Sequence, residues 1–284
     1  MDENCKTLRW SRGYVTLQPR GAMVRNLEIL MPDGQRVSPL HTAPWVGTPQ
    51  AADFDGLMQG LSGEWPCVPF GTPHQNLPPE WTHERGWEDP FAHGYAAHHD
   101  WDITATDDAL YADIKMPSSH PIETMGRCVR PCRDGISLDL WVTPRRDCRL
   151  PIGLHPVFTL PEEPERMLLE VAGVKRVMTH PENPSTDPSP AEPGALYSSL
   201  KTVHAKTGDL LDFSQLPRDE RSETRLLVIG ATGSVTLTDQ NTGTATVLRY
   251  DAEQFPFVML WISNRGRSEA PWSGRHLALG IEPI

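Results

Sequence analysis

The 284-residue sequence lacks the features of membrane-spanning and exported proteins. No stretch approaches the roughly 18–20 consecutive apolar residues that a transmembrane helix needs. Residues 1–6 (MDENCK) include two acids and no apolar core, so they do not resemble a signal peptide. The cysteines are odd in number and contain no CxxC pair, which predicts neither a disulfide framework nor a zinc ribbon. We therefore expect a cytoplasmic protein in a reducing environment.

Basic residues are scarce as well. The chain has 26 Lys and Arg against 37 Asp and Glu, which gives a formal net charge of −11. Such a surface repels the phosphates of nucleic acids and of anionic membranes, and no basic run with interleaved aromatic residues is present. We expect neither nucleic acid nor membrane among the partners of this protein.

Helical periodicity is rare, whereas apolar and polar residues alternate in many short segments. Residues 136–142 alternate in this way, and residues 234–238 lead through the turn 239–243 into 244–250, which predicts a β-hairpin. The 22 Gly and 28 Pro punctuate such segments. Further strand candidates are residues 23–30, 111–116, 167–171, 226–229, 257–262 and 276–281.

This pattern predicts a large all-β sandwich or barrel, and we expect residues 1–284 to form one domain. Two stretches interrupt the strands. Residues 43–90 are rich in Pro, Gly, Trp and His, which predicts an ordered, packed loop region that carries function. Residues 179–193 (THPENPSTDPSPAEP) predict an extended excursion on the surface.

Two residues beside prolines are candidates for acid–base chemistry. Glu282 ends an apolar strand, and Pro283 after it favours an extended backbone and should end the ladder. His155 lies in the apolar segment 152–158 and also precedes a proline. Each has a plainer interpretation, because Glu282 could be a solvated strand-end residue and His155 a hydrogen-bonded core residue.

Three segments of the chain together resemble the aldose 1-epimerase, or galactose mutarotase-like, family. That family has a His-Gly-aromatic element followed by a tryptophan, a central histidine element, and an apolar strand that ends in Glu-Pro. The same order is found here in His93-Gly94-Tyr95 with Trp101, His155-Pro156-Val157-Phe158, and Ile281-Glu282-Pro283. Looser matches are residues 65–71, 212–213 and 255–261.

The resemblance implies a β-supersandwich of large antiparallel sheets. It also implies an isomerase that interconverts the α and β anomers of an aldose by opening the sugar ring. Glu282 would remove the proton of the anomeric hydroxyl and His155 would protonate the ring oxygen, each group contributing roughly 10²–10⁴ in rate. The resemblance implies neither a metal nor an organic cofactor.

The resemblance further assigns binding of the sugar substrate to His93, Trp101, Asp212 and Trp261. His93 would hydrogen-bond the sugar, and the tryptophans could stack on one of its faces. Trp45, Trp65 and Trp272 are further aromatic candidates. A tryptophan in a β protein, however, more often packs in the core or at the rim.

The chain also departs from the family pattern. The branch that acts on hexose 6-phosphates has an arginine where this chain has Ala97, and Val157 replaces the usual tyrosine beside His155. These departures favour a neutral sugar or an unusual substrate. An arginine from elsewhere, namely Arg20, Arg25 or Arg85, could substitute for the missing one.

Other functions remain open on the sequence. His98, His99 and Asp100 lie close to His93 and are ligand types that zinc or iron binds, although the two histidines would point to opposite faces of a strand. The chain could also be a sugar-binding protein without catalysis, or act on a hexose 6-phosphate, a sugar acid or an oligosaccharide.

Overall fold

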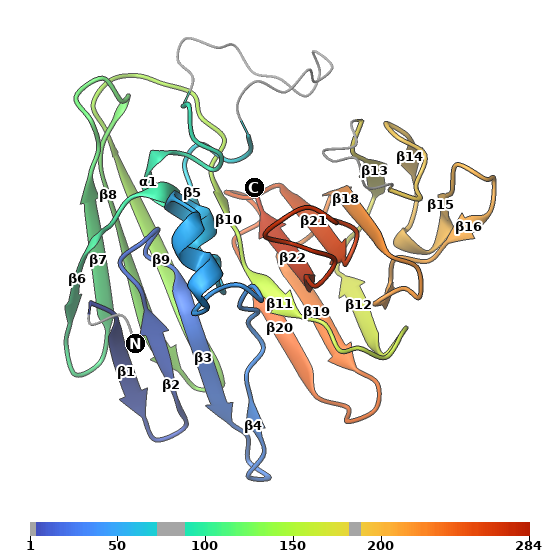
Figure 1. Ribbon diagram of the computed structural model, residues 1–284, viewed down its shortest axis with the longest axis horizontal. Helices are drawn as coiled ribbons and strands as arrows, with labels where there is room; N and C mark the ends of the chain where they lie inside the picture. The colour runs from blue at the N-terminus through green and yellow to red at the C-terminus, as the bar shows by residue number, and fades with distance from the viewer. Residues whose placement is uncertain (1–3, 73–88, 182–188) are drawn as a thin grey trace. The chain divides into compact units, whose positions relative to one another are not determined.

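The computed structural model describes residues 4–72, 89–181 and 189–284. This part consists mostly of antiparallel strands with a few short helical turns, which confirms the all-β prediction (Figure 1). The chain divides into two compact units, Met1–Leu154 (unit 1) and His155–Ile284 (unit 2). That these residues form one domain stays a prediction. No helix in the described ranges is long and apolar enough to cross a membrane.

Unit 1 contains two four-stranded sheets in which sequence neighbours pair as antiparallel meanders. The first sheet has, in order, β1 (Lys6–Trp10), β2 (Gly13–Leu17), β3 (Val24–Leu30) and β4 (Arg36–Val37). The second has β6 (Asp102–Ala105), β7 (Leu110–Lys115), β8 (Ile122–Cys132) and β9 (Gly135–Pro144). A short ribbon pairs β5 (Pro66–Cys67) with β10 (Gly153–Leu154).

Period-two alternation builds the core of unit 1. On β7, Leu110, Ala112 and Ile114 are buried, whereas the residues between them are half-buried or exposed. They pack in one cluster with apolar residues of β2 and β3, and burying one such side chain contributes roughly 1.5–3 kcal/mol. The alternation predicted for residues 136–142 is confirmed on β9.

The predicted packed loop region is confirmed for its described residues, 43–72. Trp45 and Trp65 are 0% and 1% exposed, and the indole N–H of Trp45 donates to the carbonyl of Met58 at 2.7 Å. Two 3₁₀ turns, η1 (Pro49–Asp53) and η2 (Gly56–Gly60), belong to this region. Residues 73–88 lie outside the described residues. The short helix α1 (Tyr95–His98) comes after them.

Unit 2 contains a six-stranded and a four-stranded antiparallel sheet. The first has, in order, β11 (Val157–Thr159), β22 (Leu277–Pro283), β21 (Phe257–Asn264), β18 (Ser222–Ile229), β13 (Arg176–Thr179) and β14 (Leu196–Tyr197). The second has β17 (Gln215–Leu216), β12 (Met167–Val171), β19 (Ser234–Asp239) and β20 (Ala245–Arg249). The turn η4 (Leu200–Thr202) leads into a ribbon of β15 (Val203–His204) and β16 (Leu210–Leu211).

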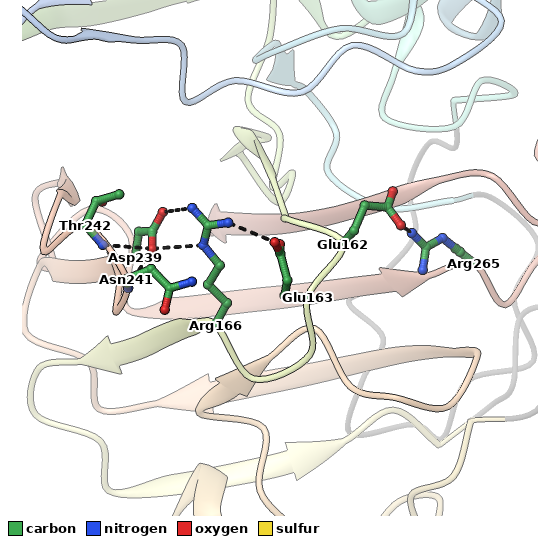
Figure 2. Close-up of polar contacts among 7 residues, drawn as sticks. All are labelled: Glu162, Glu163, Arg166, Asp239, Asn241, Thr242 and Arg265. Carbon is green, nitrogen blue, oxygen red and sulfur yellow. Dashed lines mark hydrogen bonds and ion pairs between the residues drawn. The ribbon is translucent and has the colours of Figure 1, made fainter.

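The predicted hairpin is confirmed by the pairing of β19 with β20, and a charged network holds its turn (Figure 2). Arg166 donates from Nε and Nη2 to the two carboxylate oxygens of Asp239, at 3.0 and 2.6 Å, and pairs with Glu163. Asp239 also accepts the N–H of Asn241 at 2.9 Å. The hydrogen bonds from Arg166 lower the pKa of Asp239 to about 2.

The two faces of the six-stranded sheet differ in burial. On one face Leu226, Leu260 and Ile262 have no exposed surface and belong to the core of unit 2. On the opposite face Arg225 and Leu227 of β18 are half-buried. Residues of adjacent antiparallel strands that lie opposite one another share a face. This face, named the half-buried face after these two residues, carries the residues of the candidate site, although Trp261 and Glu282 on it are buried.

The prediction that Pro283 ends the ladder is wrong. Strand β22 runs through Pro283, and the N–H of Ile284 donates to the carbonyl of Phe257 at 3.0 Å. Because Phe257 and Ile284 form a hydrogen-bonded pair, the nitrogen of Pro283 points away from β21, past the end of β11. The proline therefore costs the sheet no hydrogen bond.

The predicted surface excursion is also wrong at its start. Thr179 closes β13 and His180 follows it in the sheet register, so their side chains are only 2% and 9% exposed. Residues 182–188 of the excursion lie outside the described residues.

Candidate functional site

His155 and Glu282 come together on the half-buried face of the six-stranded sheet. The carbonyl of Pro156 accepts the N–H of Ile281 at 3.0 Å, in register with β11 and β22. Continuing this antiparallel register by one residue puts His155 opposite Glu282. Their side chains meet, with His155 Nε2 at 3.3 Å from Glu282 Oε1.

Both side chains of this pair are nearly inaccessible to solvent, at 5% and 3% exposed. Burial raises the pKa of Glu282 well above its ordinary range, and the charge of Arg225 acts in the opposite direction. Glu282 Oε1 has no aligned hydrogen bond among the described residues, although His155 Nε2 is close. Such loose contacts are common in ligand-free active sites and tighten around a substrate.

Gly280 makes room for the carboxylate of Glu282. A Cβ at Gly280 would lie 2.3 Å from Glu282 Oε1 and 3.1 Å from the Cβ of Trp261. The carboxylate therefore occupies the space that a side chain at position 280 would fill. The backbone of β22 thus fixes where Glu282 points.

Trp261 forms the next wall of the site, beside the histidine. Its ring meets that of His155 edge to face, with centroids 5.8 Å apart. Its indole N–H donates to the carboxylate of Glu223, which is also paired with Arg267 Nη2 at 2.9 Å. Since Trp261 is only 7% exposed, it contributes a fixed wall rather than an open stacking face.

The loop between β21 and β22 closes over this wall. Arg267 lies over the rings of Trp261 and Trp272, 5.2 and 4.3 Å from their centroids. The loop is tethered at its start by an ion pair between Arg265 and Glu162, seen on the right of Figure 2. His276 at its end stacks on Trp261 at 5.2 Å.

Arg225 lies on the same face, one strand beyond Trp261. The two residues are opposite each other in the β18–β21 register. Arg225 Nη2 is 3.0 Å from the Nδ1 of His180, which lies in the same row. The row His180, Arg225, Trp261 and Gly280 thus leads across the sheet to the carboxylate of Glu282.

His93 belongs to unit 1, where a tight turn displays it. Its φ is +61° and that of Gly94 is +85°. A Cβ at position 94 would lie 2.1 Å from the carbonyl oxygen of Val68, so only glycine fits there. The ring of His93 packs edge-on against Trp65 and Phe70.

The sequence matches no family model and no curated protein. The structure matches a galactose mutarotase-like protein from Lactobacillus casei with a TM-score of 0.64 at 16% identity, covering 98% of this chain and 87% of that one. It matches a GalM/aldose epimerase homologue from C. elegans with a TM-score of 0.66 at 13% identity, covering 98% and 88%.

A galactose mutarotase related enzyme from Lactobacillus acidophilus also matches, with a TM-score of 0.61 at 14% identity over 98% of this chain and 84% of that one. The chain has the galactose mutarotase-like fold. This confirms the supersandwich implied by the sequence resemblance. Since one fold hosts many functions, the activity is argued from the site.

Trp101 and Asp212, to which the resemblance assigned sugar binding, make hydrogen bonds within the protein. Trp101 is 3% exposed in the core cluster of unit 1, and its indole N–H donates to the carbonyl of Ala96 at 2.8 Å. The Oδ1 of Asp212 accepts the N–H and O–H of Ser214, at 2.8 and 2.6 Å.

His98 and Asp100, which were considered as metal ligands, are engaged in local contacts. His98 uses Nε2 for the carbonyl of Ala92 and Nδ1 for the N–H of Leu57. Asp100 forms an ion pair with Arg20 at 2.6 Å. Arg20 is also one of the arginines that were considered for binding a phosphate. Within the described ranges, no group of three or more metal-ligating side chains is found. Arg85 lies outside the described residues.

The sequence did not point to four residues that lie around the His155–Glu282 pair in the structure, namely Glu223, Arg225, Arg267 and Gly280. The signal for the first two was available, because Glu223 and Arg225 alternate along the apolar strand whose start was placed at residue 226. Extending that strand by four residues puts two charges on one face. Arg267 lies on a loop, and Gly280 affects the site because it has no side chain. Neither residue therefore changes the alternation of apolar and polar residues from which strands were predicted.

Proposed function

We propose that this protein is an aldose 1-epimerase, an isomerase that interconverts the α and β anomers of a sugar. The observation that carries the proposal is the contact of 3.3 Å between His155 Nε2 and Glu282 Oε1. An imidazole and a carboxyl at this distance can reach the ring oxygen and the anomeric hydroxyl of one pyranose, since these two oxygens share a carbon.

Ring opening needs two proton transfers. Glu282, as carboxylate, takes the proton of the anomeric hydroxyl, and His155, as imidazolium, gives its proton to the ring oxygen while the C1–O5 bond breaks. The raised pKa of Glu282 makes its carboxylate a stronger base than an exposed one. The products are the open-chain aldehyde, a protonated Glu282 and a neutral His155.

Reclosure reverses the two roles. After rotation about C1–C2, the neutral His155 accepts the proton of the O5 hydroxyl as O5 attacks C1 from the other face. The protonated Glu282 returns its proton to the carbonyl oxygen. Both groups are restored, so the cycle consumes no co-reactant.

The surroundings of the pair support this chemistry. Gly280 gives the carboxylate its place, and Trp261 packs against the ring of His155. Both contacts restrict the pair before a substrate arrives, which is the condition under which positioning accelerates a reaction.

The test is to mix purified protein with freshly dissolved α-D-glucose or α-D-galactose and to follow anomeric equilibration by polarimetry or NMR. We expect the wild type to accelerate equilibration of at least one sugar, and Glu282→Gln to lose the acceleration. Hexose 6-phosphates form a second arm, because other members of the fold family act on them. Equilibration no faster than in buffer with all of these sugars would contradict the proposal and favour a sugar-binding protein without catalysis.

A further inference from the structure

Arg267 is held rigidly although it lies on a loop. Its Nη2 is paired with Glu223 at 2.9 Å, and its guanidinium lies over Trp272 and Trp261, 4.3 and 5.2 Å from their centroids. The side chain of Glu223 is 0% exposed, whereas that of Arg267 is 21% exposed. A buried carboxylate and two indoles thus fix a cation that still reaches solvent.

This arrangement leaves part of the guanidinium available to a ligand. An arginine has five N–H donors in a planar fork. Among the described residues, Glu223 is the acceptor paired with Arg267, and the contact uses Nη2. Nε and Nη1 therefore keep donors for further acceptors. Because the side chain is already immobilised, a ligand that binds these donors loses little additional side-chain entropy.

Arg267 and the proposed acid, His155, both neighbour the indole of Trp261. The Trp261 centroid is 5.2 Å from Arg267 Cζ and 5.8 Å from the ring centroid of His155. Both side chains therefore lie within one ring contact of the same indole, a distance that a pyranose and its substituents can span. A sugar whose anomeric centre lies at His155 and Glu282 would bring its more distant substituents toward Arg267.

The charge around Arg267 selects among possible substituents. Glu223 already neutralises the guanidinium, and the Oε2 of this carboxylate is buried next to it. A sugar carboxylate or phosphate at Arg267 would be placed close to this like charge, which is unfavourable in a partly buried site. Two neighbouring hydroxyl oxygens can accept from the fork without this repulsion.

We propose that Arg267 binds two adjacent hydroxyls of a neutral aldose and thereby determines the specificity of the site. This inference deepens the proposed function, since it takes the ligand to be the sugar whose anomeric centre meets His155. It concerns binding, and so it can be tested without turnover.

The first experiment uses methyl β-D-galactoside and methyl β-D-glucoside, which cannot undergo mutarotation because C1 carries no free hydroxyl. Affinities for the wild type are measured by calorimetry or ligand-observed NMR, together with the 2-, 3-, 4- and 6-deoxy analogues. We expect loss of either of two neighbouring hydroxyls to weaken binding about 10- to 100-fold, as when a buried hydrogen-bond donor loses its acceptor. A deoxy series in which no two neighbouring positions matter would overturn the proposal.

The second experiment uses Arg267→Met with Arg265→Met as a matched control from the same loop. We expect Arg267→Met to bind the parent glycosides about as weakly as the wild type binds the sensitive deoxy analogues, and to lose discrimination between them. Arg265→Met, which breaks only the ion pair with Glu162, should keep it. Near-ultraviolet circular dichroism of each variant checks that the tryptophan packing is intact.

Competition with methyl glucuronide and glucose 6-phosphate tests the charge argument. We expect both to bind the wild type more weakly than the neutral glycosides, and tighter binding of either would overturn the proposal. Failure of all methyl glycosides to bind would also overturn it. Binding with the expected deoxy pattern but without mutarotation of free sugars would instead contradict only the proposed function.

Discussion

Each unit buries a histidine–carboxylate pair, and the two pairs have almost the same geometry. In unit 1, His120 Nε2 lies 3.4 Å from Asp89 Oδ2, and in unit 2, His155 Nε2 lies 3.3 Å from Glu282 Oε1. The side chains are 2% and 1% exposed in the first pair and 5% and 3% in the second. Distance and burial therefore do not distinguish a structural pair from a catalytic one.

The backbone around the two carboxylates does distinguish them. Asp89 accepts the N–H groups of Phe91 and Tyr95, at 2.9 and 2.8 Å, one with each oxygen. The N–H of Ile122 donates to the Nδ1 of His120 at 3.0 Å. These bonds stabilise the turns that display His93, so the unit 1 pair has a structural role.

The carboxylate of Glu282 differs from that of Asp89 in its backbone hydrogen bonds. Among the described residues no backbone N–H donates to it, and burial raises its pKa well above the ordinary range. A buried carboxyl kept without backbone donors destabilises the folded state, and such residues cluster at functional sites. This contrast supports the proposal that Glu282 acts on a ligand.

The largest expected effect comes from breaking the unit 2 pair. Glu282→Gln and His155→Gln should each lower kcat for mutarotation by roughly 10²–10⁴. The double variant should be little slower than either single one, because the two groups transfer protons in one step and act as a unit. NMR exchange spectroscopy of the anomers measures all three. Full additivity of the two losses would contradict a concerted pair.

The second-largest effect on kcat should come from a substitution that displaces the carboxylate of Glu282 but keeps the residue. Gly280→Ala places a Cβ where Glu282 Oε1 lies, so the carboxylate must move away from His155. We expect kcat to fall by about 10², the cost of misplacing a catalytic group by about 1 Å. The matched control is Gly135→Ala in β9, where a Cβ would meet nothing closer than 4.0 Å. An equal fall in the control would point to a general effect on strands.

The two pairs should have opposite effects on stability. Asp89→Asn should lower the free energy of unfolding by about 1–3 kcal/mol, because it weakens hydrogen bonds to a charged group. Glu282→Gln should leave that free energy unchanged or raise it, because it removes a buried carboxyl that lacks backbone donors. Denaturant unfolding of both variants at neutral pH tests the contrast, and loss of stability in Glu282→Gln equal to that in Asp89→Asn would remove the distinction.

The pH dependence of the free energy of unfolding also tests this contrast, because the raised pKa of Glu282 predicts the direction of the change. The folded-state pKa of Glu282 is above its unfolded value, so between the two values the folded state binds more protons. Its contribution to stability therefore falls as pH rises through that window, starting near the ordinary glutamate pKa of about 4.3. Unfolding measured from pH 4 upward should show this fall in the wild type and not in Glu282→Gln.

The sequence predicted many of the strands and pointed to both members of the His155–Glu282 pair, but it did not predict what surrounds the pair. The alternation of apolar and polar residues identified β9 and the β19–β20 hairpin, because this pattern can be seen in the sequence without knowledge of the fold. His155 and Glu282 were found by resemblance, and the sheet register confirms that they meet. Gly280, by contrast, acts through the absence of a side chain, and this effect requires knowing that Glu282 folds back over it.

Two features of the structure could not be predicted, for a similar physical reason. Trp101 follows a family element, yet its indole packs in the core of unit 1, and sequence order does not tell which way a ring turns. Pro283 was expected to stop β22, but a proline is tolerated where its nitrogen faces no neighbouring strand. Which neighbour a strand has on each side is set by tertiary pairing, which no local pattern contains.

The smallest expected effect lies in a charged contact that is remote from chemistry. Asp239→Asn removes the paired charge from Arg166 at the β19–β20 turn. Both side chains are partly exposed, so the free energy of unfolding should fall by only about 0–1 kcal/mol at neutral pH.

The pKa of Asp239 is lowered to about 2 in the folded state. Its contribution to stability is therefore complete above the unfolded value near 3.9 and is lost as pH falls through about 2. The difference in stability between wild type and variant should therefore narrow on acidification, in the opposite direction to Glu282. Activity should be unchanged, because a carboxylate saturated with hydrogen bonds serves the fold, as Asp89 does.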